Sequence, residues 1–159
     1  MAELPNRPHL RHLRREARLL QRESAEGLQS AQERLAQSYG FEDWAGLKHT
    51  IEAGCLVLQW AGRQLGKREL EALRDRGEAP LPKSILAALR HPNPRVRYEC
   101  LGLLDHLADD ACAAAMIAAT NDRVPRVRRM AVHALGCQGC KSSLLCADLN
   151  SVFPPDRGA

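Results

Sequence analysis

Aromatic residues are scarce in this sequence. Only 4% of the 159 residues are Phe, Trp or Tyr, although hydrophobic residues make up 45% of the chain. The apolar content is therefore mostly Leu and Ala, which lose little rotamer freedom in a helix. Because β-branched and aromatic residues, the usual strand formers, are few, the composition predicts an all-α protein.

Long hydrophobic runs are absent as well. No apolar stretch approaches the roughly 20 residues that are needed to span a bilayer. Residues 1–16 are polar and basic and do not contain the apolar segment of a secretory signal. We therefore expect a cytoplasmic protein that does not enter a membrane. Without an export signal, the six cysteines are expected to be reduced thiols.

The common catalytic templates are also missing. The chain has no Gly-rich phosphate loop, no His-Glu-x-x-His, no Gly-x-Ser-x-Gly and no dinucleotide-binding glycine fingerprint. We therefore expect a protein that is not an enzyme and needs no cofactor. The net charge is only +4, but of the 23 basic residues just four are Lys and the other 19 are Arg. Arg suits phosphate contacts and ordered ion-pair networks better than Lys does, although a GC-rich genome gives the same bias.

The first half of the chain contains three helical patterns. Residues 9–22 place Leu10, Leu13, Ala17 and Leu20 on one stripe and arginines on the other faces. Such a basic helix can lie on an anionic membrane or on nucleic acid, but its narrow stripe without Trp or Phe favours packing against the rest of the protein. Helices are also predicted over 28–38 and 39–54, the latter ending at Gly54. The apolar residues 55–62 that follow fit a helical turn or a strand.

A break at residues 77–82, Gly-Glu-Ala-Pro-Leu-Pro, divides the chain. We expect an N-terminal helical cap region over 1–76, repeats over 82–149 and a flexible tail over 150–159. Within the repeats, the string Pro-Arg-Val-Arg begins at Pro94 and again at Pro125, 31 residues later. Helical patterns precede each copy at 84–90 and 111–120, and a further one covers 141–149. Two helices in a unit of about 30 residues are typical of an α-solenoid, with each Pro in the first turn of a second helix.

Residues 89–104 and 121–136 resemble the HEAT repeat, in particular the short variety of phycobilisome lyases. The family pattern is Asp-Pro-x-x-x-Val-Arg, and this sequence matches it at Pro92, Val96, Arg97, Asp122, Val127 and Arg128. In the family the Asp and the Arg form a ladder between neighbouring repeats, and His91 replaces the Asp at one rung. The resemblance implies a right-handed α-solenoid of about two and a half helical hairpins with an N-terminal helical cap. It also implies a scaffold or adaptor that binds another protein.

The front of the chain resembles a leader segment that precedes repeats in some bacterial proteins. The matching residues are Leu4, Pro5, Pro8, Leu10, Leu13, Tyr39, Gly40, Phe41, Trp44, Leu47 and Lys48. This resemblance implies a bacterial source and a cap over the exposed face of the first repeat. A terminal repeat needs such a cover because each unit buries its apolar face only against its neighbours.

The second helices of the repeats are expected to line a concave partner-binding face. Equivalent positions then stack in rows, Arg95 with Arg126, Tyr98 with Arg129 and Gly102 with His133. This basic, partly aromatic strip suits an acidic protein segment or, as the alternative function, the phosphates of a nucleic acid. The alternative is that these exposed arginines form only a solvated charged surface without a binding function. With so small a face we expect a monomer or a weak dimer.

A group of cysteines follows the last predicted second helix. His133, Cys137, Cys140 and Cys146 have a spacing that can close a tetrahedral zinc site. The alternative is that these cysteines are small apolar residues.

Overall fold

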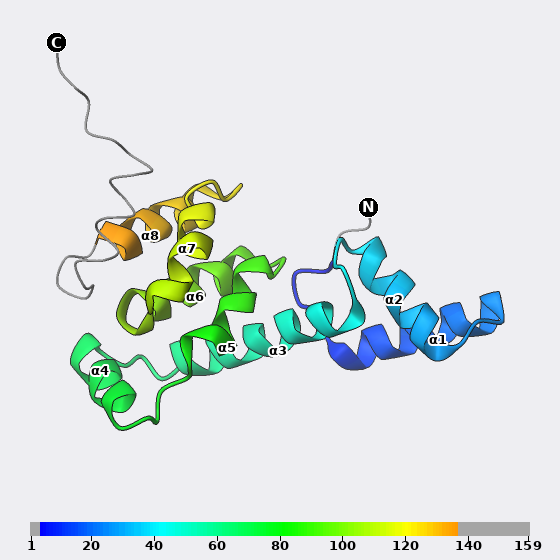
Figure 1. Cartoon of the computed structure of the whole chain (residues 1–159), viewed down its shortest axis with the longest axis horizontal. Coiled ribbons are helices and arrows are strands. Elements are labelled where there is room, and N and C mark those ends of the chain that lie inside the picture. The colour runs from blue at the N-terminus through cyan, green and yellow to red at the C-terminus, as the bar shows by residue number, and fades with distance from the viewer. Residues whose placement is uncertain (1–3, 137–159) are drawn as a thin grey trace, which may run out of the picture.

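The computed structural model describes residues 4–136, and this part of the chain contains helices and no strand. The structure is all-α, as the composition predicted (Figure 1). The helices are α1 (Leu10–Ser24), α2 (Leu28–Ser38), α3 (Trp44–Ala61), α4 (Lys67–Asp75), α5 (Pro82–Leu86), α6 (Pro94–Leu107), α7 (Ala113–Ala119) and α8 (Pro125–Gly136). Two short 3₁₀ helices are η1 (Ala87–Arg90) and η2 (Asp110–Cys112). The predicted helix at 141–149 and the predicted tail lie outside the described residues.

Helices α1 and α2 form a hairpin that packs on the first half of α3 (Figure 1). The apolar stripe predicted for the first helix faces this core, with Leu13 and Ala17 fully buried. The cluster consists of Leu13, Ala17, Leu35, Ala36, Phe41, Leu47 and Ile51. Asp43 caps the N-terminus of α3, where its Oδ1 accepts a hydrogen bond of 2.6 Å from the Gly46 N–H.

Helix α3 is longer than the sequence predicted. It continues through residues 55–61, so the segment that fitted either a turn or a strand is helix. The prediction that Gly54 ends this helix was wrong, because Gly54 lies in the interior of α3 and is buried. The second half of α3, including Ala53 and Val57, belongs to a different core from the first half. A single helix thus joins the N-terminal hairpin to the repeats.

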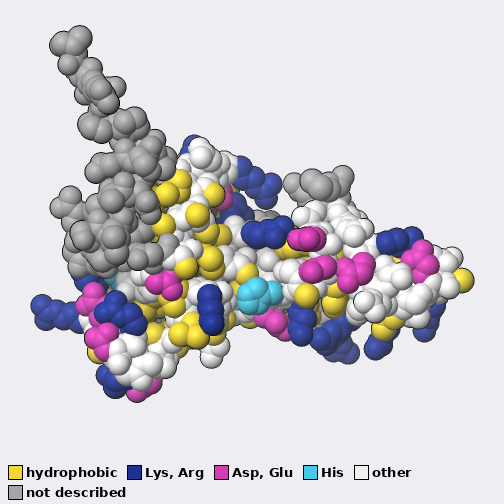
Figure 2. Space-filling model, in the orientation of Figure 1, with side chains coloured by type: hydrophobic (Ala, Val, Ile, Leu, Met, Phe, Trp, Pro, Cys, Tyr) yellow, Lys and Arg dark blue, Asp and Glu magenta, His cyan; other side chains and the backbone are white. Residues whose placement is uncertain are grey.

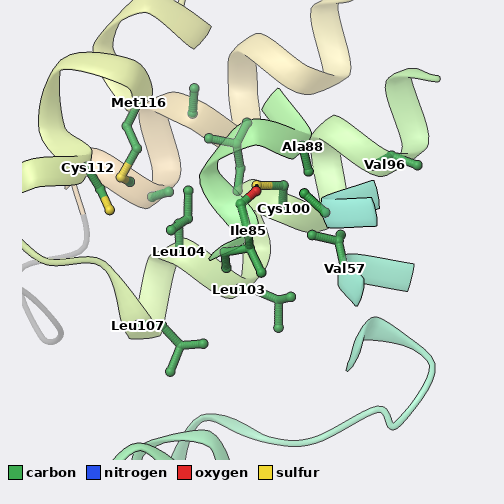
Figure 3. Close-up of a cluster of buried hydrophobic side chains, with 14 of the residues drawn as sticks. Val57, Ile85, Ala88, Val96, Cys100, Leu103, Leu104, Leu107, Cys112 and Met116 are labelled. Carbon is green, nitrogen blue, oxygen red and sulfur yellow. The ribbon is translucent and has the colours of Figure 1, made fainter. Parts of the chain in front are cut away.

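The repeats follow as two units, α5–η1 with α6 and α7 with α8 (Figure 1). Helices α6 and α8 begin at Pro94 and Pro125, as predicted. Helix α6 packs between α3 and α8, so three long helices lie in a row. Val57, Ile85 and Leu104, from α3, α5 and α6, are among the buried side chains of the shared core (Figure 3).

This core is not confined to residues 82–149. Ala53, Val57 and Leu70 come from the region expected to be the cap and are buried in the same cluster as the repeats. The domain boundary at 77–82 stays a prediction. Within residues 4–136, no helix is long and apolar enough to cross a membrane.

Candidate partner-binding groove

The repeats are joined by a buried ion pair between Arg97 of α6 and Asp122, which precedes α8. Arg97 Nε lies 2.7 Å from Asp122 Oδ2 and Nη2 lies 2.9 Å from Oδ1. The side chains are only 7% and 11% exposed. Arg97 Nη1 also donates to the carbonyls of His91 and Pro92, at 2.8 and 2.9 Å. Arg97 is therefore held inside the structure and is not part of a binding surface, as the resemblance implied.

The equivalent arginine of the next unit makes the same backbone contacts. Arg128 Nη1 donates to the carbonyls of Asp122 and Arg123, at 2.8 and 3.3 Å. These two carbonyls are 31 positions after those that accept from Arg97. The repeated arginine therefore fastens the loop before its own helix in both units, and Arg97 in addition pairs with Asp122 of the next unit.

Between α6 and α8 the surface is hollowed. The hollow measures about 440 Å³ and is lined by Pro94, Arg95, Tyr98, Glu99, Val124, Arg126 and Val127. Two smaller hollows adjoin it and share Tyr98: one of about 260 Å³ reaches Arg129 and His133, and one of about 250 Å³ reaches Trp60 on α3. Because Tyr98 lines all three, we call this continuous surface the Tyr98 groove.

All five residues predicted to bind a partner line the Tyr98 groove. The predicted stacking differs in one respect: the Arg126 guanidinium lies 4.3 Å from the centre of the Tyr98 ring, whereas the sequence pattern placed Arg129 beside that ring. Arg95 is 77% exposed, with its Nε 3.8 Å from Glu99 Oε1. His133 Nε2 lies 3.6 Å from Asp105 Oδ2. The groove therefore has an aromatic–cation pair at its centre and separate charges along its rim.

The sequence of this region matches a known family of helical repeats. The model of HEAT repeats matches residues 82–144. This segment is therefore similar to HEAT repeats, and its described part has the helix pairs of an α-solenoid. No curated protein and no solved structure matches the chain. The phycobilisome-lyase variety of the repeat and the bacterial leader segment stay predictions.

His91 departs from the HEAT pattern and yet keeps one function of the Asp that it replaces. Its Nδ1 accepts the backbone N–H of Asn93 at 3.1 Å, just as Asp122 Oδ1 accepts that of Val124 at 2.8 Å. The ring is buried against α3, where a Cβ on Gly54 would lie 2.6 Å from His91 Cδ2. Burial and the nearby Arg97 charge lower the pKa of His91 to about 4. A neutral imidazole therefore replaces the carboxylate at this HEAT rung.

The sequence reasoning missed Trp60 as a residue of the groove. Trp60 lies in the last turn of α3 and lines the hollow that also contains Tyr98 and Met130. The Arg63 guanidinium lies 4.3 Å from the centre of its ring. The sequence could have indicated Trp60, because a helix that continues beyond Gly54 brings Trp60 close to the repeats. Since the helix was expected to end at Gly54, Trp60 was not considered as a groove residue.

The zinc prediction concerns mostly residues that the structure does not describe. His133 is on α8 with 65% of its side chain exposed, while Cys137, Cys140 and Cys146 lie outside the described residues. Among residues 4–136, no group of three His, Cys, Asp or Glu side chains is arranged to hold a metal ion. Cys100 and Cys112 are buried, and burial raises the pKa of the Cys100 thiol. Both thus have the environment of small apolar residues.

Proposed function

We propose that this chain is a non-enzymatic scaffold that binds a protein partner in the Tyr98 groove. HEAT repeats commonly serve as interaction scaffolds, and residues 82–144 match their model. The observation that carries the proposal is the hollow between α6 and α8, where Arg126 stacks on Tyr98. Tyr and Arg are the side chains that most often dominate the binding energy of protein interfaces.

The lining of the groove indicates the chemistry of the partner. Pro94 and Val124 are partly exposed and provide an apolar surface at the starts of α6 and α8. Arg95, Arg126 and Arg129 provide positive charge around it, and no carboxylate in the described part of the chain forms an ion pair with Arg126 or Arg129. A short segment that combines carboxylates with one apolar side chain suits this lining. Its carboxylates can form charge-assisted hydrogen bonds with the arginines.

The same lining disfavours nucleic acid in the Tyr98 groove. Glu99 lies in the groove beside Arg95, and the buried Asp105 carboxylate lies 3.6 Å from His133 behind its far end. Phosphates that follow the groove would pass the Glu99 carboxylate and approach Asp105. The mixed charge therefore favours a protein segment over a continuous polyanion at this site.

A peptide selection tests the proposal. A random phage-displayed peptide library is selected on the full chain, and binders to a Tyr98→Ala/Arg126→Glu variant are removed. The affinity of the retained peptides is then measured by fluorescence anisotropy. We expect an acidic consensus and an affinity loss of at least tenfold in the variant, equivalent to about 1.4 kcal/mol. Arg68→Glu on α4, an exposed arginine that does not line the groove, is the charge-matched control and should bind normally.

Two outcomes would contradict the proposal. One is the selection of peptides that bind wild type and the double variant equally. The other is an affinity loss as large in Arg68→Glu as in the variant, since it would show a response to net charge alone. Melting temperatures of all proteins must agree, because Tyr98 and Arg126 both contact neighbouring side chains.

A further inference from the structure

The outer face of α1 carries five arginines: Arg11, Arg14, Arg15, Arg18 and Arg22. At 3.6 residues per turn they fall within an arc of about 100° on the helix surface. Leu13 and Ala17 occupy the opposite side and are buried against α2 and α3. In the view of Figure 2, dark-blue side chains gather along the outer edge of the α1 end of the molecule. We call this surface the α1 arginine face.

No ion pair between these arginines and a carboxylate is present in the part of the chain that the structure describes. Elsewhere in the described chain, arginines such as Arg34, Arg74 and Arg76 do pair with a neighbouring Asp or Glu. The α1 arginine face therefore presents positive charges to solvent that no ion pair in the described part of the chain neutralises.

The spacing of the five arginines lowers the stability of α1 as an isolated helix. Arg11 is followed by Arg14 and Arg15 at three- and four-residue spacings, and Arg18 is followed by Arg22. Like-charge pairs at four-residue spacing destabilise a helix. The first turn of α1 also lacks an acidic residue that would complement the helix dipole. A polyanion bound along the helix would remove this repulsion.

We propose that the α1 arginine face binds the phosphate backbone of double-stranded nucleic acid. Arg forms bidentate hydrogen bonds with phosphate. From Arg11 to Arg22 the face extends for about 16 Å along a straight helix, which is the scale of several successive phosphates on one strand. Among the described residues it carries no Phe, Tyr or Trp, and its only rings are those of His9 and His12 near one end, so it lacks the row of stacking platforms typical of single-strand binding; this favours a duplex.

Two other anionic partners fit the face less well. A protein interface needs apolar anchors, and among residues 4–136 Leu19 is the only large hydrophobic side chain that lines this surface. An amphipathic helix that enters a membrane uses its apolar side, but on α1 that side is buried in the protein core. The site is also separate from the Tyr98 groove, so this inference does not depend on the proposed function.

The test is a salt titration with a fluorescein-labelled 20-base-pair DNA duplex and the full chain. Anisotropy gives the dissociation constant at KCl concentrations from 50 to 200 mM. In Arg11→Gln/Arg15→Gln/Arg18→Gln, we expect affinity at 50 mM KCl to fall at least 30-fold. The slope of log affinity against log salt should become shallower by about 2.7, because three phosphate contacts are lost. The variant should melt no lower than wild type, since the three side chains are exposed and repel one another.

The matched control neutralises the same number of charges in the Tyr98 groove. Arg95→Gln/Arg126→Gln/Arg129→Gln should keep wild-type duplex affinity and slope, whereas it should lose the peptides selected on the groove. Equal losses of duplex binding in the two triple variants, or no loss in the α1 variant, would overturn the proposal. Vesicles with 30% phosphatidylserine are tested in parallel. Tight binding to vesicles without binding to the duplex would identify a membrane surface as the partner instead.

Discussion

Arg97 and Asp122 lie 25 residues apart in the sequence and form a two-hydrogen-bond ion pair that is almost excluded from solvent. Burial alone would raise the pKa of Asp122. The hydrogen bonds from Arg97 and from the Val124 N–H, with the charges of Arg97 and Arg123, outweigh burial and lower this pKa below its ordinary value. Because one partner comes from each unit, the pair fixes α6 relative to the loop that leads into α8.

Removing one partner of this pair should be much more harmful than removing both. Asp122→Ala leaves the Arg97 guanidinium buried without a counter-ion, and we expect a loss of about 3–5 kcal/mol in the free energy of unfolding. Arg97→Met/Asp122→Leu leaves no buried charge and should recover most of that loss. The exposed ion pair between Arg95 and Glu99 gives the control, because Arg95→Met should change the free energy of unfolding by less than about 1 kcal/mol. Urea denaturation measures all three, and a double variant as unstable as Asp122→Ala would contradict the expectation.

Stability should fall between pH 6.5 and pH 4 because of His91. In the unfolded chain this imidazole binds a proton near its ordinary pKa, whereas in the folded chain its pKa is about 4. Since the unfolded state binds more protons in this window, lowering the pH favours unfolding, by an amount on the order of 2 kcal/mol. Well above pH 6.5 the group is neutral in both states and has no effect. The contribution of Asp122 is lost at lower pH, because its folded pKa lies below the ordinary value.

The variant His91→Asn distinguishes the effect of His91 on the pH dependence of stability from that of Asp122. The Asn side-chain oxygen can accept the Asn93 N–H as His91 Nδ1 does, but it does not titrate. Urea midpoints of this variant should therefore change little between pH 6.5 and pH 4.5, where those of wild type decline. A decline of the same size in both proteins would assign the pH dependence to other groups.

Substitution by alanine should have opposite effects on stability at two glycines of the long helices. Ala is favoured over Gly in a helix interior by about 1 kcal/mol. At Gly102 of α6 the nearest atom to a new Cβ is Met130 Cε at 3.7 Å, so Gly102→Ala should stabilise the protein. At Gly54 the new Cβ would lie 2.6 Å from the His91 ring, which a backbone hydrogen bond holds in place. Gly54→Ala should therefore destabilise by roughly 1–3 kcal/mol.

Thermal melting of the two glycine variants measures the contrast. In a His91→Asn background the obstructing ring is gone, so Gly54→Ala should be much less harmful there. Stabilisation by Gly54→Ala in the wild-type chain would show that α3 and His91 are not in close contact.

The sequence predicted features that depend on local periodicity and on the repeat. The identical Pro-Arg-Val-Arg strings correctly located the starts of α6 and α8, because proline at the first helical position is a local preference. The apolar stripe through Leu13 and Ala17 was also a local signal. By contrast, Gly54 was interpreted as a helix stop, whereas it serves a tertiary contact with a residue 37 positions later. The same misinterpretation concealed Trp60, and no local pattern indicated that Arg126 rather than Arg129 stacks on Tyr98.

Cysteine reactivity provides an independent probe of the repeat core. Cys55 is exposed on α3, whereas Cys100 and Cys112 are buried, and Cys100 Sγ donates to the Ile85 carbonyl at 3.2 Å. Cys137, Cys140 and Cys146 lie outside the described residues and are changed to Ser for this experiment. With Ellman's reagent, one thiol should then react at the rate of a free cysteine. The other two should react at least about a thousandfold more slowly, because their exposure requires opening of a core worth several kcal/mol. Urea should bring all three to one rate, and fast reaction of Cys100 in the native protein would mean that α5 and α6 are not packed as described.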